Sequence, residues 1–185
     1  MGDAGARHVI LTARTSLRPV SMEDVGTLHH LWTDPEVRRF LWDDEVIPYE
    51  MAEAAVREAV EGFGRHGFGL WISERRQHRG ALIGFCGLRH LDDEPQVELL
   101  YGISPPEWGR GFATEVALAV LRYGFEWAGL TRVLGIADAG NLASRRVLEK
   151  IGMTVEAYVA TEGRKEARYA IRSEDFRRVR PPQRG

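Results

Sequence analysis

The sequence lacks several features that would point to a particular class of protein. It contains one cysteine, Cys86, so no disulfide can form within the chain. It has neither the run of about 18 apolar residues that a membrane-spanning helix needs nor an apolar segment of signal-peptide length near residue 1. The formal net charge is only −2, and the six histidines show no spacing typical of metal ligands. We therefore expect a cytoplasmic protein that works without a metal, a membrane or a nucleic acid.

What is present is an ordinary globular composition, with 44% apolar and 28% charged residues. A chain of 185 residues is long enough for one domain with a sizeable core. We expect a loose segment over residues 1–8, one domain over residues 9–176, and a basic tail over residues 177–185, which read "RRVRPPQRG".

Periodicity and cap residues predict an ordered set of strands and helices. Strands are expected over residues 9–20, 68–75, 81–88, 96–103, 132–138, 154–161 and 166–173. Helices are expected after a cap at Ser21, after Asp34 and Pro35, over residues 49–64 with Gly64 at the end, from Gly111 to about Gly129, and after a cap at Asn141. This order predicts one mixed α/β domain.

The stretch "SPPEWGRGFATEV", residues 104–116, joins a predicted strand to a predicted helix through two prolines and two glycines. The first amides of a helix have no partner within it and lie at the positive end of its dipole, so glycines there let a phosphate approach the main chain closely. The candidate phosphate-binding residues are Gly109, Arg110, Gly111, Phe112, Ala113 and Thr114. The spacing fits neither a P-loop nor a dinucleotide fingerprint. By itself, the joint is equally consistent with a tight turn that binds nothing.

Further motifs occur in a fixed order around this joint. "LRPVSMEDVGTLHHLWTDPEVRRFL" and "LIGFCGL" precede it, and "RVLGIAD" and "NLASRRVLEKIGM" follow it. Together these motifs resemble the GNAT N-acetyltransferases, in particular the Rim-type branch of ribosomal-protein N-terminal acetyltransferases, in which the joint commonly reads "WGKGYATEA". The resemblance implies an acyl-CoA N-acyltransferase fold, with mostly antiparallel N-terminal strands and with central strands that splay apart and are flanked by helices.

The resemblance also implies acetyl-CoA as the cosubstrate. In that family the loop R/Q-x-x-G-x-G/A binds the pyrophosphate, and it corresponds here to residues 108–113, with Trp108 in place of the arginine or glutamine. The pantetheine arm is expected between the strand that contains Leu99, Leu100 and Tyr101 and the strand over residues 133–137. Asn141 is expected to bind the cofactor or to cap its helix.

Two residues are candidates for the chemistry. Glu98, at the start of the central strand, is expected either to take a proton from the acceptor amine, as a glutamate does in many relatives, or to be a surface carboxylate. Many members of the family place a tyrosine where this chain has Leu148. The Rim-type branch therefore implies Ser144, one turn earlier, as the group that donates to the sulfur of coenzyme A, unless Ser144 only packs its helix. Cys86 lies in an apolar strand and is expected to be buried and inert.

The resemblance places the acceptor near residues 22–47 and the last hairpin, with Trp42, Asp43 and Tyr158 as candidate binding residues. The carboxylates of "WDDEV" (residues 42–46) and "DDE" (residues 92–94) predict either an acidic mouth for a cationic amine or solvated loops. A peptide N-terminus, a polyamine or an amino-sugar is the expected partner, and homodimers are common among similar proteins. The alternatives are an acyl-CoA-binding sensor without activity, which Leu148 favours, and a general nucleotide-binding protein.

Overall fold

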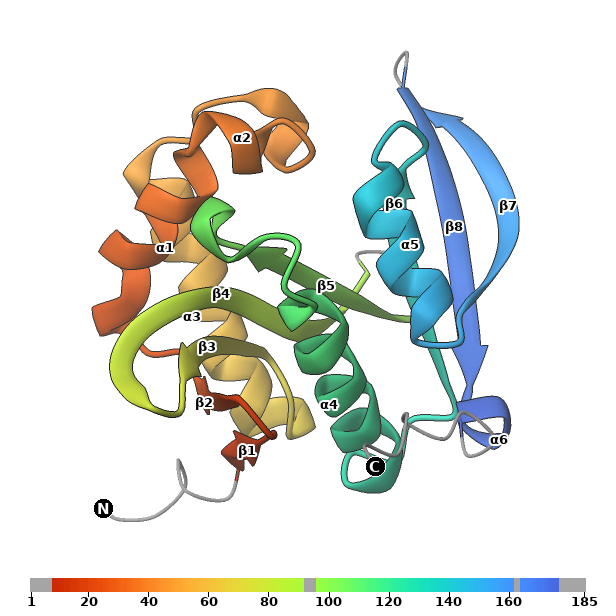
Figure 1. Cartoon of the computed structure of the whole chain (residues 1–185), viewed down its shortest axis with the longest axis horizontal. Coiled ribbons are helices and arrows are strands. Elements are labelled where there is room, and N and C mark those ends of the chain that lie inside the picture. Colours follow the sequence, from red (N-terminus) through yellow and green to blue (C-terminus); the bar gives the residue numbers. More distant parts are fainter. Residues whose placement is uncertain (1–7, 92–95, 162–163, 177–185) are drawn as a thin grey trace.

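The computed structural model describes residues 8–91, 96–161 and 164–176, which form one mixed sheet with helices on both faces (Figure 1). The strands are β1 (Ile10–Leu11), β2 (Thr15–Pro19), β3 (Leu70–Arg75), β4 (His78–His90), β5 (Val97–Ile103), β6 (Arg132–Asp138), β7 (Thr154–Thr161) and β8 (Arg164–Arg172). The helices are α1 (Val25–Thr33), α2 (Pro35–Arg38), α3 (Tyr49–His66), α4 (Phe112–Glu126), α5 (Leu142–Lys150) and α6 (Ser173–Phe176). No helix within these ranges is long and apolar enough to cross a bilayer.

The strands follow the order β1-β2-β3-β4-β5-β6-β8-β7 across the sheet. Every neighbouring pair is antiparallel except β5 and β6, which are parallel. The predicted mixed α/β class and the antiparallel arrangement of the N-terminal strands are therefore confirmed.

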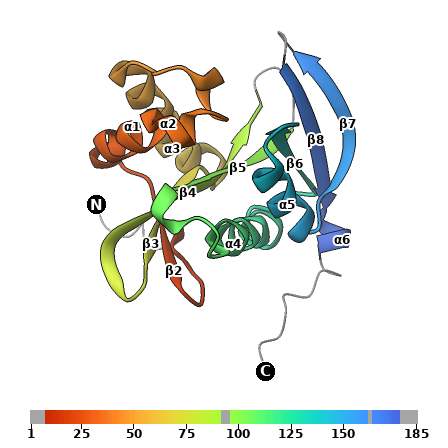
Figure 2. The same cartoon turned by 45° about the horizontal axis from the view of Figure 1, so that its top comes forward.

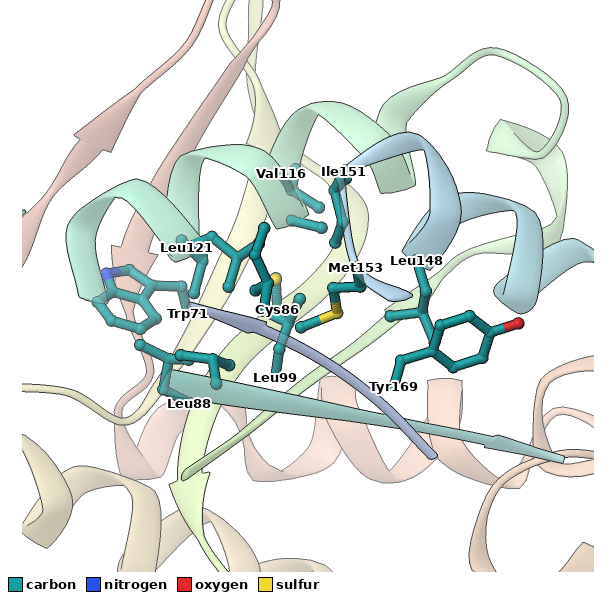
Figure 3. Close-up of a cluster of buried hydrophobic side chains, with 14 of the residues drawn as sticks. Trp71, Cys86, Leu88, Leu99, Val116, Leu121, Leu148, Ile151, Met153 and Tyr169 are labelled. Carbon is teal, nitrogen blue, oxygen red and sulfur yellow. The ribbon is translucent and has the colours of Figure 1, made fainter. Parts of the chain in front are cut away.

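Alternation along the strands divides the core between the two faces of the sheet. On one face Cys86 and Leu99 pack with Val116 and Leu121 of α4 (Figure 3). On the other face the sheet packs against α1 and α3, in a cluster that includes Val25, Leu28, Trp32, Val56, Leu70, Ile72 and Phe85. Figure 1 shows this layering, with α4 in front of the sheet and α3 behind it. Cys86 is fully buried, and burial raises the pKa of its thiol, as expected for an inert packing residue.

The predicted N-terminal strand is wrong, because the chain reverses within it. Residues 9–20 form a hairpin of β1 and β2, in which the Thr12 amide donates to the Thr15 carbonyl at 3.0 Å. His8, expected in the loose segment, is instead held in place, since its carbonyl accepts a 2.6 Å hydrogen bond from Trp71 Nε1. Residues 1–7 and the basic tail over residues 177–185 lie outside the described residues.

Two predicted helix ends also need correction. α3 continues past Gly64 to His66, because Gly67 is the residue that adopts the left-handed φ of 77° needed to end the helix. α4 ends at Glu126, before Gly129. The predicted cap at Asp34 is confirmed, since its side chain accepts hydrogen bonds from the amides of Glu36 and Val37.

Candidate active site

The parallel strands β5 and β6 separate soon after they meet. Their pairing is limited to Glu98 with Leu134 and Leu99 with Gly135, although each strand has seven residues. Beyond Leu99 the edge of β5 that faces β6 has no ladder partner, so its main-chain polar groups are available to a ligand. Figure 2 shows the consequence, with β8 and β7 turned away from the β3–β5 half of the sheet. The predicted splay is confirmed.

The glycine joint leads from the end of β5 to the start of α4. Gly109 and Gly111 have left-handed φ values of 72° and 77°, which only glycine adopts without strain. The first bond of the helical ladder runs from the Glu115 amide to the Gly111 carbonyl at 3.1 Å, so the amides of the residues between them have no acceptor within the helix. Those residues are Phe112, Ala113 and Thr114.

Trp108 fixes this loop through its side chain. Its Nε1 donates a 2.6 Å hydrogen bond to the carbonyl of Ile103, the last residue of β5. The residue as a whole is exposed, at 47%. Trp108 therefore ties the loop to the sheet, and its predicted contact with the cofactor stays a prediction.

Three arginines surround the joint. Arg110 and Arg75 both bind Glu107, at 3.2 Å and 2.5 Å, and Arg14 donates to the Arg110 carbonyl at 2.9 Å. Of the three, only Arg110 was predicted from sequence, since no motif links Arg14 or Arg75 to residues some hundred or thirty positions away. The helix amides and the two glycines fit a diphosphate group. Each of the three arginines is also paired with a carboxylate beside the joint, Arg14 with Glu115 and the other two with Glu107.

Glu98 lies on the α3 face of β5, opposite Arg89 of β4. Only 5% of its surface is exposed, and its Oε2 accepts a 2.8 Å hydrogen bond from Arg89 Nε. Burial raises the pKa of Glu98, and the charge of Arg89 opposes that rise. The alternative of a surface carboxylate is therefore wrong, while the role of Glu98 as a base stays a prediction.

Strand β8 adds charged residues that the motifs did not indicate. Glu166 and Arg168 act on Glu98 electrostatically, Glu166 raising its pKa and Arg168 lowering it. The buried Nε of Arg168 has no hydrogen-bond partner among the described residues. The available signal was the alternation in "RKEARYAIR", which places Glu166 and Arg168 on one face of β8.

Ser144 lies on α5, across the splay from β5. Its Oγ is 2.9 Å from the hydroxyl of Tyr101, which also donates to the Ser144 carbonyl at 3.0 Å. Burial raises the pKa of Tyr101, so its phenol is neutral and able to donate. Asn141 caps α5, its Oδ1 accepting from the Ser144 amide at 3.0 Å. Leu148 is buried, at 1% exposure, against Gly135 of β6.

A cavity of about 370 Å³ lies on the face of the sheet that packs against α3, between that helix and strands β3–β5. Trp42 lines it together with Leu100 and Arg89, the partner of Glu98. The side chain of Asp43 and the acidic residues 92–94 lie outside the described residues. Tyr158 lies elsewhere, on β7, where its hydroxyl accepts a 2.9 Å hydrogen bond from Arg145 of α5. The structure therefore does not bring Tyr158 together with Trp42.

Comparisons with known proteins agree with this arrangement. The family of the acetyltransferase (GNAT) domain matches residues 14–154. The uncharacterized protein YkkB of Bacillus subtilis is 33% identical over 158 residues, which are 80% of this chain and 86% of the relative. The spermidine N(1)-acetyltransferase of Escherichia coli K12 is 28% identical over 152 residues, which are 79% of this chain and 76% of the relative.

Solved structures have the same fold. A GNAT-family acetyltransferase from Bacillus anthracis has a TM-score of 0.75 at 24% identity, covering 90% of this chain and 99% of its own. RimL, a ribosomal L7/L12 alpha-N-protein acetyltransferase in complex with coenzyme A, has a TM-score of 0.73 at 18% identity, covering 89% of this chain and 98% of its own. At these identities the two structures show the fold alone.

Proposed function

This chain belongs to the GNAT acetyltransferases, enzymes that use acetyl-CoA, and we propose that it transfers the acetyl group directly to the primary amine of a small molecule or peptide. The observation on which the proposal rests is the splay of β5 from β6 beside the glycine joint of α4. This combination offers an extended main-chain edge and a phosphate-binding helix start in one place.

Acetyl-CoA supplies the acetyl group as a thioester. The amides of residues 109–114 would hold its diphosphate, with Arg110 as a nearby cation. The free edge of β5 from Leu100 onward would bind the arm and the thioester carbonyl through its main chain. Amides aimed at that oxygen stabilise the charge that develops on it, a contribution of about 3–4 kcal/mol where a single such donor has been removed from an enzyme.

The transfer joins the amine nitrogen to the acetyl carbon and releases the thiol, with one proton passing to sulfur and one to solvent. An α-amine titrates near ~8 and a lysine amine near ~10.4, so the acceptor arrives mostly protonated. Glu98 would accept its proton, directly or through water. The raised pKa of this buried carboxylate makes it a better base than an ordinary glutamate.

Ser144 would donate its hydroxyl hydrogen to the departing sulfur. Tyr101 gives its one hydrogen to the Ser144 carbonyl, so the serine hydroxyl donates across the 2.9 Å contact to the phenol oxygen and would turn from it to the sulfur as the thiolate leaves. Tyr101 thus holds Ser144 in place in a chain that has Leu148 where many relatives have a tyrosine.

The Rim-type assignment rests on "WGRGFATEV" and "NLASRRVLEKIGM". A relative named for spermidine supports a polyamine as the acceptor, and the Rim-type motifs support a peptide α-amine. Formation of a homodimer stays a prediction that the mass of the protein in solution would test.

The test is release of free thiol from acetyl-CoA over a panel of peptide N-termini, polyamines, amino acids and aminoglycosides. Turnover with any of these amines supports the proposal. Tight binding of acetyl-CoA with no thiol release across the panel would instead identify an acyl-CoA sensor, and displacement of acetyl-CoA by ATP would identify a general nucleotide-binding protein.

A further inference from the structure

The cavity beside Glu98 has the size of a small-molecule site. Its volume of about 370 Å³ lies within the range of roughly 300–1,000 Å³ for ligand pockets. Apolar groups dominate its wall, including Leu70, Leu100, Phe68 and the methyl groups of Ala55 and Ala59. Such a wall fits an apolar body about the size of one amino-acid residue.

Two indole rings stand at one end of this cavity. Trp32 and Trp42 both line it, with ring centroids 5.6 Å apart, and Trp32 also packs edge-on against Phe85 of β4. Phe85 is paired with Gly102 of β5, two residues beyond Leu100. The indole pair therefore lies alongside the part of β5 that has already separated from β6.

Both indole nitrogens are buried donors without a hydrogen-bond partner among the described residues. Trp32 is only 3% exposed. Buried polar groups are nearly always hydrogen-bonded, and leaving one unpaired is costly, so each exception calls for an explanation. Neither nitrogen has accessible surface as the rings lie, so a ligand oxygen would remove this cost by accepting from an indole N–H that turns toward the cavity.

The segment that holds Trp42 is also strained. Trp42 and Asp44 have φ values of 52° and 62°, the left-handed region that side chains other than glycine rarely adopt. Arg38 secures this turn by an ion pair with the Asp44 carboxylate at 3.3 Å. Strain of this kind clusters at ligand sites, where the surrounding structure maintains it.

The charges around the cavity do not suit a polyamine. Glu58 is the single carboxylate among the described lining residues, and the two lining arginines, Arg65 and Arg89, already occupy the nearby carboxylates of Glu61 and Glu98. Glu98 is close by but already paired with Arg89. A second or third ammonium group of a polyamine would therefore find few negative partners here.

We infer that the acceptor, under the proposed function, is the α-amine of an apolar amino acid or of a peptide that begins with one. The apolar side chain occupies the cavity, and the carbonyl oxygen next to the amine accepts a hydrogen bond from the Trp32 or Trp42 indole. The amine itself then lies near Leu100 and Glu98, where β5 leaves β6.

Thiol release from acetyl-CoA with four matched amines tests this inference. L-phenylalaninamide has both the ring and the carbonyl, phenethylamine lacks the carbonyl, glycinamide lacks the ring, and spermidine is the polyamine. We expect L-phenylalaninamide to have the highest kcat/KM. Spermidine as the best acceptor would overturn the inference but leave the acetyltransferase function standing. No thiol release with any amine would overturn both.

The variant Trp42→Phe keeps an aromatic side chain but removes the five-membered ring of the indole with its N–H, and phenethylamine reports the loss of packing that both amines share. It is expected to lower kcat/KM for L-phenylalaninamide by roughly two- to tenfold more than for phenethylamine, the value of one hydrogen bond. Trp127→Phe is the matched control, because Trp127 is 80% exposed and does not line the cavity. An equal loss for both amines in Trp42→Phe would contradict a bond to the carbonyl.

Discussion

The hydroxyl groups of Tyr101 on β5 and Ser144 on α5 lie 2.9 Å apart. This contact links the two halves of the sheet at the place where β5 separates from β6. Because the two groups share one hydrogen bond, their contributions to catalysis should not be independent. The Tyr101 ring packs against the core, and both hydrogen bonds of its hydroxyl within the described residues go to Ser144.

We expect Ser144→Ala and Tyr101→Phe each to lower kcat by roughly three- to tenfold, since each removes about one hydrogen bond from the departing sulfur or its donor. The double variant should be no slower than Ser144→Ala. Steady-state thiol release measures all three, with Tyr123→Phe, which loses a bond to the Gly67 carbonyl away from the splay, as the control. Fully multiplicative losses would contradict a shared role.

The protonation of Glu98 should appear in the pH dependence of the reaction. A base acts only when deprotonated, so kcat/KM should rise with pH through an acid limb whose pKa lies above the ordinary value of glutamate. Glu98→Gln should remove this limb and lower the plateau by about a hundredfold or more. Glu53→Gln is the control, because Glu53 is a half-buried residue of α3 that pairs with Arg57, its i+4 neighbour on the same helix.

Arg89 offers an independent check on the same limb. Its charge holds the pKa of Glu98 down against the effect of burial. Replacing it by Met should therefore move the acid limb to higher pH without removing it. A limb that stayed in place would show that another group controls the rate.

The glycine joint can be tested at Gly111. Alanine there must adopt a φ of 77°, at a cost of about 1–2 kcal/mol, and any shift that relieves the strain would misplace the amides of the helix start. We expect KM for acetyl-CoA to rise by roughly five- to tenfold. Gly129→Ala provides the control, since Gly129 has a similar φ of 70° and open space around it but lies after α4. Equal KM changes in both variants would argue against a phosphate site at the joint.

The order of the elements and the joint could be predicted because both are local properties of the chain. Cap residues such as Asn141 and the glycines at 109 and 111 act on their immediate neighbours in the chain, so their identities in the sequence are sufficient to predict the helix starts. The prediction of one strand over residues 9–20 failed because a hydrogen bond from the Thr12 amide to the Thr15 carbonyl turns the chain there, although the alternation of apolar and polar residues continues through the turn.

The surroundings of the site could not be predicted, because they depend on contacts between distant residues. Arg14 contacts Arg110 of the joint although the two are 96 positions apart in the sequence, and Tyr101 and Ser144 are 43 positions apart. The cavity likewise arises from the packing of α3 on β3–β5. Family resemblance supplied Glu98 and Ser144, but it gave neither the Arg89 pair nor the unpaired indoles.

The buried ion pair of Asp24 should govern part of the acid stability. Arg18 donates hydrogen bonds to both carboxylate oxygens of Asp24, at 2.8 Å and 2.6 Å, and the main-chain amide of Ser21 donates another. Burial opposes ionisation of Asp24, but these bonds outweigh it and lower its pKa. A lowered pKa in the folded state means that the stabilisation is complete above the ordinary pKa of about 4 and is lost as the pH falls through the lowered value.

Asp24→Asn should therefore reduce the free energy of unfolding by about 1–3 kcal/mol at pH 7. The difference from the unchanged protein should shrink as the pH is lowered toward and below the folded pKa of Asp24. Urea unfolding at pH 7 and at pH 3 measures it. Glu156→Gln, which removes a more exposed ion pair with Arg132, should cost no more than about 1 kcal/mol at pH 7. A difference for Asp24→Asn that stayed constant down to pH 3 would mean that the carboxylate charge does not stabilise this turn.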